Sequence, residues 1–129
     1  MKMSNAFEDL GIPISFKVDI ADVDCAFQKA INSASSNEDL KLQITKSYSI
    51  IRCDILRGEE ILKIFNILQE SVVVSLAFLE EMMDLDGDEV ITISQKIYEK
   101  LSSIILSSEN ISSFAILFMK YKYISKAFL

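Results

Sequence analysis

Apolar residues recur at helical spacing along most of the chain, so that they fall on one face of successive α-helices. The clearest case follows Asp19, where Ile20, Val23 and Phe27 share a face. Asp19 can accept hydrogen bonds from the free amides of the first helical turn, so we expect it to be the N-cap. A second amphipathic helix follows Asn37, which can cap it in the same way. Since only a short polar break separates the two helices, they are expected to pack as an antiparallel hairpin.

Shorter elements precede this hairpin. The segment Phe7–Leu10 has the composition of a helical turn that carries an aromatic residue, and Gly11 and Pro13 follow it. An extended piece is expected from Ile14 to Val18, leading to Asp19. The polar run Asn32–Asn37 is expected to separate the two helices of the hairpin.

Further helices are expected in the rest of the chain. Their approximate ranges are 55–68, 72–85, 91–105 and 111–128, with polar breaks at 52–54, 69–71, 86–88 and 107–110. Asp54 is placed to cap the first of these helices. The run Val90–Ile93 could instead form a short strand. Six or so helices without convincing strand pairing predict an all-α protein.

Composition agrees with a helical globular protein. The 129 residues are 50% hydrophobic and 25% charged, with only 3 Gly and 1 Pro. The net charge of −6 disfavours binding to nucleic acid or to an anionic membrane. The longest apolar runs, Val72–Leu79 and Phe114–Met119, are far shorter than the roughly 20 residues of a membrane-spanning helix. Without a signal-like N-terminus, we expect a cytoplasmic protein.

The side chains available for chemistry are few. The chain has no histidine, which excludes histidine-dependent triads and histidine zinc sites. Its two cysteines, Cys25 and Cys53, are isolated in the sequence and are interpreted as buried or incidental free thiols. Neither Cys25 nor Ser75 has a visible base beside it. We therefore expect a protein that is not an enzyme and that needs no cofactor.

Acidic residues offer two weak motifs. The segment Asp84–Glu89 resembles a calcium loop, but its glycine is the fourth residue instead of the sixth, and the twelfth is Gln95. A solvated turn between helices explains it better. The pairs Glu59–Glu60 and Glu80–Glu81 are expected to lie on solvated helix faces.

A group of apolar residues with acidic neighbours permits two interpretations. Its members are Leu76, Leu79, Met82, Met83 and Leu85, flanked by Glu80, Glu81 and Asp84. Methionines at helical spacing are most often core residues, but methionine also suits adaptable binding surfaces. Core and binding surface therefore both remain open at this point.

Four segments, in order along the chain, resemble the HscB-type J-domain co-chaperones of iron–sulfur cluster assembly. The first is Phe7–Phe27, with its aromatic turn, Leu-Gly-Ile-Pro, extended lead-in, Asp and a Phe-Gln pair. The second is Gln43–Leu62, in which Arg57-Gly58-Glu59 stands where the family has Arg-Ala-Glu. The others are Ala77–Leu85 and Lys120–Lys126.

The resemblance implies an all-α fold made of a truncated J-domain-like helical hairpin and a small C-terminal three-helix bundle. The J-like domain would span residues 1–69, and the bundle residues 70–129. In the family, the first docks on an HscA-type ATPase chaperone and the second binds an IscU-type iron–sulfur scaffold. The family's scaffold contacts correspond to Leu79, Met83, Asp84 and Tyr123. A further acidic contact of the family falls at Gly87, which departs from the pattern.

The largest departure concerns the family's His-Pro-Asp motif, which stimulates the ATPase. Ser35, Ser36 and Asn37 stand in its place, and the basic helix before it is reduced to Lys29. ATPase stimulation is therefore expected to be impaired. The competing interpretation is a helical interaction or regulatory protein that shares only the hairpin geometry. In that case the side chains expected at the scaffold surface would instead be core residues.

Overall fold

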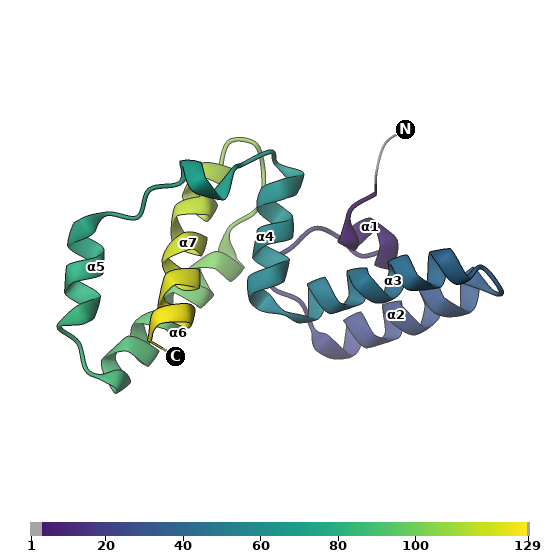
Figure 1. Cartoon of the computed structure of the whole chain (residues 1–129), viewed down its shortest axis with the longest axis horizontal. Helices are drawn as coiled ribbons and strands as arrows, with labels where there is room; N and C mark the ends of the chain where they lie inside the picture. Colours follow the sequence, from purple (N-terminus) through teal and green to yellow (C-terminus); the bar gives the residue numbers. More distant parts are fainter. Residues whose placement is uncertain (1–3, 129) are drawn as a thin grey trace. The chain divides into compact units, whose positions relative to one another are not determined.

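The computed structural model describes residues 4–128, which form seven α-helices and one short 3-10 helix, with no strand (Figure 1). The predicted all-α fold is therefore confirmed. The chain separates into two compact units, Met1–Ile64 and Phe65–Leu129. The boundary expected from the sequence lay after residue 69. Within residues 4–128, no helix combines the length and apolar character that crossing a membrane requires.

The N-terminal unit is built around a helical hairpin. Its helices are α1 (Ala6–Leu10), α2 (Ile20–Ala34), α3 (Glu38–Arg52) and α4 (Asp54–Ile64). Helices α2 and α3 lie antiparallel against each other, as the sequence predicts, and α1 packs against both (Figure 1). Large side chains that are fully buried come from all four helices and from the segment between α1 and α2: Phe7, Phe16, Val23, Ile51, Ile61 and Leu62.

Both caps predicted for the hairpin are confirmed. The Asp19 carboxylate accepts a hydrogen bond of 2.8 Å from the Ala21 amide. The side-chain oxygen of Asn37 accepts one of 3.1 Å from the Leu40 amide. The break between the helices is shorter than predicted, because α2 continues to Ala34 and ends where Ser35 takes a positive φ of 52°. Small polar residues thus continue this helix instead of stopping it.

Arg57 joins three parts of the N-terminal unit from a buried position. Its side chain is 2% exposed, and its guanidinium lies 5.1 Å from the centre of the Phe16 ring. Its Nε donates to the Phe16 carbonyl at 2.6 Å, and Nη1 donates to the Ile51 carbonyl at 2.7 Å. These bonds fix the extended lead-in and the end of α3 onto α4. Backbone acceptors thus receive hydrogen bonds that they would otherwise lack in a dry interior.

The start of α4 differs from the prediction. Asp54 was expected to be its cap, but the helix begins at Asp54 itself. The Cys53 carbonyl accepts the first helical hydrogen bond, 2.8 Å from the Arg57 amide. Only one residue thus separates α3 from α4, and the chain turns at Cys53, whose backbone is extended.

Two carboxylates fasten α1 to the rest of its unit. Glu60 of α4 accepts a hydrogen bond of 2.7 Å from the Ala6 amide. Asp9 accepts hydrogen bonds from Ser47 at 2.6 Å and from Gln43 at 3.0 Å, both on α3. A five-residue helix is unstable alone, so α1 depends on these contacts and on its buried apolar side chains.

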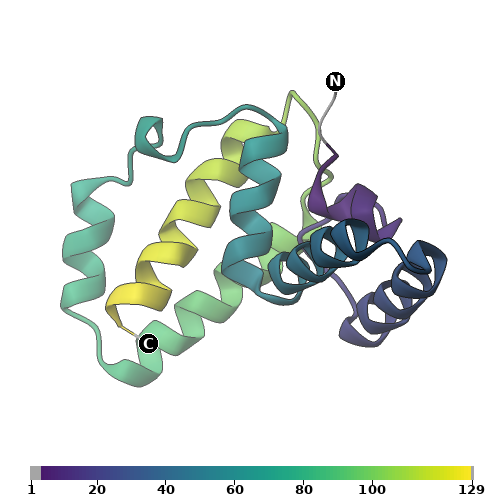
Figure 2. The same cartoon turned by 45° about the vertical axis from the view of Figure 1, so that its right-hand side comes forward.

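The C-terminal unit contains η1 (Gln69–Ser71), α5 (Leu76–Met83), α6 (Gly87–Ser103) and α7 (Ile111–Ala127). Helices α6 and α7 pack closely against each other, while α5 stands beside α7 (Figure 2). The fully or almost fully buried apolar side chains of α6 and α7 include Val90, Leu101, Phe114, Phe118 and Ile124. The Phe114 and Phe118 rings stack one helical turn apart, with centroids 6.0 Å apart.

Two helix starts in this unit differ from those predicted, and one alternative prediction is wrong. Helix α5 begins at Leu76 instead of residue 72, because Ser75 caps it and the preceding valines favour extended backbone. Helix α6 begins at Gly87, directly after its cap Asp86, so the predicted break is a helix start. The alternative strand at Val90–Ile93 is therefore wrong, since these residues lie inside α6.

We expect Arg57→Ala to lower the free energy of unfolding of the N-terminal unit by about 3 kcal/mol, because two buried carbonyls lose their donor. Arg57→Lys should recover only part of this loss, since an ammonium cannot reproduce the planar fork. Urea denaturation followed by amide NMR signals of α2 and α3 measures both changes.

Arg52→Ala is the matched control, because Arg52 is exposed and its ion pair with Asp24 lies at the surface. It should change the same free energy by less than about 1 kcal/mol. An equal loss in the Arg52 and Arg57 variants would contradict the role assigned to the buried guanidinium.

Candidate functional site

Apolar side chains expected to bind a partner lie on the exposed side of α5. Leu76 and Met83 are 69% and 71% exposed, and Leu79 is half-buried. Their spacing of three and four places them on one stripe of the helix. Asp84, the C-cap of α5, is exposed at its end. We call Leu76, Leu79, Met83 and Asp84 the α5 surface.

The other side of α5 faces inward. Met82 is completely buried, and the half-buried Phe78 ring lies 5.0 Å below the Lys120 ammonium of α7. The apolar group of the sequence is therefore divided between core and surface, with Met82 inside and Met83 outside. The competing interpretation places Met83 in the core, and its exposure does not agree with that.

Tyr123 lies on α7, the helix that α5 contacts through Lys120. Its ring is half-buried and meets the Phe128 ring edge to face at 5.9 Å between centroids. Residues 120 and 123 are one helical turn apart, so both lie on the same side of α7. Among residues 4–128, no hydrogen bond or ring contact joins Tyr123 to the α5 surface. The structure brings the two helices together without placing these side chains in contact.

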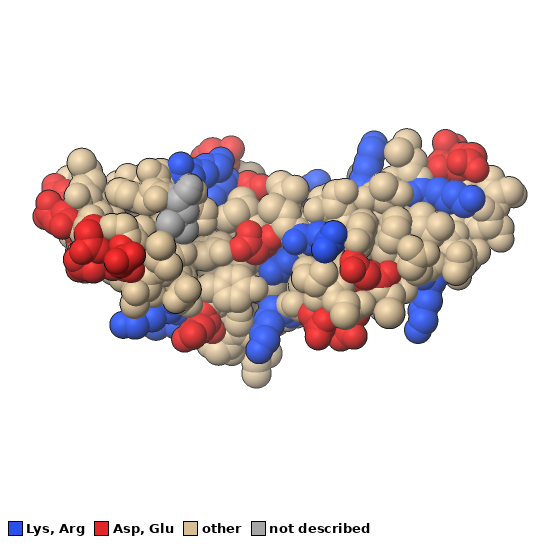
Figure 3. Space-filling view, turned by 90° about the horizontal axis from the view of Figure 1, so that it is seen from below, with Lys and Arg blue, Asp and Glu red and all other residues tan. Residues whose placement is uncertain are grey.

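The corner between α5 and α6 is acidic. Exposed carboxylates gather there, and Figure 3 shows Asp and Glu side chains grouped at the α5 end of this unit. They are Glu80, Glu81, Asp84, Asp86, Asp88 and Glu89. Carboxylates beside an exposed apolar stripe attract a partner with basic residues around its own apolar contact.

The turn between α2 and α3 contains the three residues that align with His-Pro-Asp in the resemblance described above. Ser35, Ser36 and Asn37 are all exposed. The Asn37 amide donates to the Ala34 carbonyl at 2.9 Å, and its side chain caps α3. Asn37 therefore has a structural role, and the turn carries no titratable group.

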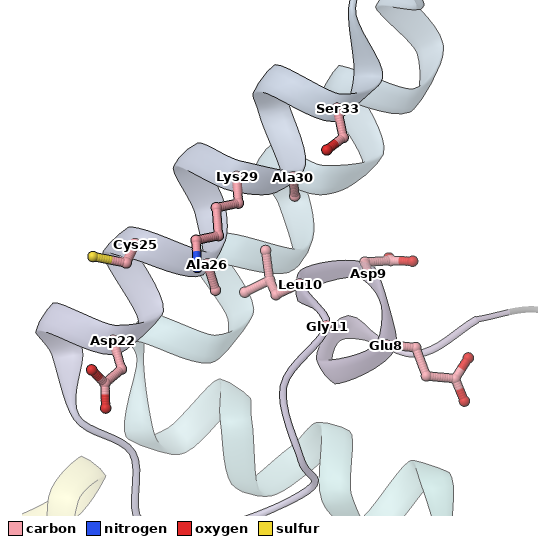
Figure 4. A pocket seen from close by; sticks show the side chains of 10 residues that line it. All are labelled: Glu8, Asp9, Leu10, Gly11, Asp22, Cys25, Ala26, Lys29, Ala30 and Ser33. Carbon is pink, nitrogen blue, oxygen red and sulfur yellow. The ribbon is translucent and has the colours of Figure 1, made fainter.

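Lys29 lies in an open hollow between α1 and α2. The hollow has a volume of about 490 Å³, and Figure 4 shows Leu10 and Ala26 directed toward each other within it. Its remaining lining residues are Glu8, Asp9, Gly11, Asp22, Cys25, Lys29, Ala30 and Ser33. The lining therefore carries three carboxylates and one ammonium, which is a net negative charge. The resembled family has a basic helix at the corresponding position.

Phe27 and Tyr48 form an aromatic cluster on the hairpin that was not predicted from the sequence. The Tyr48 hydroxyl donates to the Asp24 carboxylate at 2.6 Å, and the Tyr48 ring stacks on Phe27 at 4.1 Å between centroids. The hydrogen bond to Asp24 raises the pKa of Tyr48, desolvation raises it further, and the Arg52 guanidinium acts in the opposite direction. The cluster joins the start of α2 to the end of α3. The spacing of Tyr48 and Arg52 by four residues was its signal in the sequence.

Cys25 and Cys53 are both free and exposed, and Cys25 lines the same hollow as Lys29. Their exposure excludes the buried alternative for both and agrees with the expectation of incidental free thiols. Cys25 lies on α2, and Cys53 lies between α3 and α4. Within residues 4–128, no group of three acidic or thiol side chains is arranged to hold a metal ion.

Comparisons with protein-family models, with curated protein sequences and with solved structures found no match to this chain. The candidate site is therefore defined by the geometry described above. Each unit has its own candidate region: the α5 surface with its acidic corner in the C-terminal unit, and the hairpin turn at Ser35–Asn37 in the N-terminal unit.

We expect Asp24→Asn to lower the pKa of Tyr48, because it removes the carboxylate that accepts a hydrogen bond from the phenol hydroxyl. Ultraviolet absorbance during an alkaline titration measures the pKa, with Tyr48→Phe as the reference that isolates this tyrosine. The folded pKa of Tyr48 lies above its ordinary value, so the stabilisation is complete below that ordinary value. It is lost as the pH rises through the folded pKa. An unchanged titration in the Asp24→Asn variant would contradict the assignment.

Proposed function

We propose that the protein is a non-catalytic co-chaperone of the HscB type, which binds an IscU-type iron–sulfur scaffold and presents it to an HscA-type ATPase chaperone. The observation that carries this proposal is the exposure of Met83 and Leu76 on one stripe of α5, next to an acidic corner. This stripe overlaps the segment Ala77–Leu85 that resembles the family's scaffold-binding helix; Met83 lies within that segment, and Leu76 directly precedes it. The order of the elements, a hairpin followed by a helical unit, supports the same proposal.

The α5 surface suits protein binding on energetic grounds. Burying a leucine or methionine side chain contributes about 1.5–3 kcal/mol, so two such residues can anchor a contact. The acidic corner adds attraction to a basic partner and raises the association rate more than the affinity. Apolar burial and electrostatic attraction together favour a partner whose apolar contact is surrounded by basic residues.

The proposed action is tethering. A chain that holds the scaffold through one unit and the chaperone through the other raises the local concentration of each near its partner. This effect needs no acid, base or nucleophile. The exposed acidic and apolar side chains described above are sufficient for it.

We further propose that this co-chaperone stimulates the ATPase weakly or not at all. The turn at Ser35–Asn37 offers hydroxyl and amide groups, and the Asn37 amide side chain is already occupied in capping α3. The hollow that contains Lys29 is also lined by three carboxylates, those of Glu8, Asp9 and Asp22, so this region lacks the positive surface that the resembled family presents to its chaperone. The same acidic balance favours a second candidate, a helical regulatory protein that uses the α5 surface for a different partner.

Met83→Ser should weaken binding of the IscU-type scaffold by about 10-fold or more, because the exposed anchor loses its apolar contact. Isothermal titration calorimetry measures this affinity. Ile105→Ser is the matched control, since Ile105 is 82% exposed but lies after α6, away from the α5 surface. It should leave the affinity unchanged. Absence of heat and of complex with the unaltered protein at tens of micromolar would overturn the scaffold assignment.

In single-turnover assays with an HscA-type chaperone, we expect ATP hydrolysis to remain near its basal rate when the protein is added. A co-chaperone with an intact His-Pro-Asp motif provides the positive control. The physical reason is that the turn supplies neither an imidazole nor a free carboxylate to the chaperone. Acceleration equal to that of the positive control would show this expectation to be wrong.

A further inference from the structure

Helix α5 is attached to its unit by few side chains. Of its 8 residues, only Met82 is buried. Phe78 is half-buried and held by its contact with the Lys120 ammonium. An isolated helix of this length is unstable in water, so α5 stays helical only while these side chains are docked.

The connections on either side of α5 allow it to separate. Before it, Val72 and Ser75 have extended backbone, and Val73 is 81% exposed. After it, the turn from Asp84 to Asp86 is exposed except for the half-buried Leu85. Neither connection is held by a run of buried side chains.

Helices α6 and α7 have a core that does not depend on α5. Leu101, Phe114, Phe118 and Ile124 are completely buried, and the two helices pack against each other. The Tyr98 and Tyr121 rings add a contact at 5.7 Å between centroids. Undocking of α5 exposes Met82 and Phe78 but leaves these contacts in place.

We propose that α5 opens and recloses as a local unit while α6 and α7 remain folded. The α5 surface exists as a helical stripe only in the closed state. A partner that binds this stripe therefore binds the closed state alone, and its apparent affinity falls by the fraction of molecules that are open. This last step rests on the proposed function, whereas the opening itself does not.

Amide hydrogen exchange of the full chain, followed by NMR or mass spectrometry, tests the opening. We expect the amides of α5 to be protected at least about 10-fold less than the central amides of α6 and α7. Their exchange should also depend little on low concentrations of urea, since local opening exposes little surface. Equal protection and equal urea dependence in all three helices would overturn the proposal.

Met82→Ala and Met82→Leu form a matched pair for the same measurement. The alanine variant should accelerate exchange in α5 alone, whereas the leucine variant conserves volume and should behave like the unaltered protein. Leu101→Ala is the comparison in the α6–α7 core and should accelerate exchange in α6 and α7 as well. If Met82→Ala accelerated all three helices equally, α5 would be part of the common core and the proposal would be wrong.

Adding the IscU-type scaffold separates this inference from the proposed function. Binding with slower exchange confined to α5 supports both, and binding with exchange slowed equally in all three helices overturns the local opening. If the scaffold does not bind, the proposed function fails. The exchange of the free protein then still decides whether α5 opens locally.

Discussion

The N-terminal unit depends on one buried guanidinium. Arg57, on α4, donates to the carbonyls of Phe16 and Ile51. It therefore connects the extended segment before α2 and the end of α3 to α4. A buried charge is costly unless hydrogen bonds compensate it, and here backbone acceptors do so. The end of α3 and the segment before α2 are thereby held on α4, and the turn between α2 and α3 faces solvent.

The C-terminal unit is organised differently. Its two long helices share an apolar core, whereas α5 contributes one fully buried side chain and leaves much of its apolar stripe exposed. Helix α5 docks through one narrow face, on which Met82 is the fully buried side chain. Met83 lies on another face of the helix and is therefore exposed. The small buried face of α5 and its exposed apolar stripe thus result from the same packing arrangement.

Architecture and activation are separable in this protein. The hairpin closes through a backbone hydrogen bond at Ala34 and through the Asn37 cap, and these interactions require no catalytic side chain. The hairpin geometry therefore does not require the residues that the resembled family uses to stimulate an ATPase. The proposed tethering relies on exposed apolar and acidic side chains, and a histidine is not needed for it.

The sequence by itself determined the helices and the caps at Asp19 and Asn37, because spacing of apolar residues and capping are local properties. Only the tertiary structure separated Met82 from Met83, since adjacent residues on a helix point about 100° apart and both are apolar. It alone showed that Arg57 is buried, because one of its acceptors, the Phe16 carbonyl, lies 41 residues away. The start of α5, by contrast, is set by a local serine cap after valines that favour extended backbone, so its signal was present in the sequence.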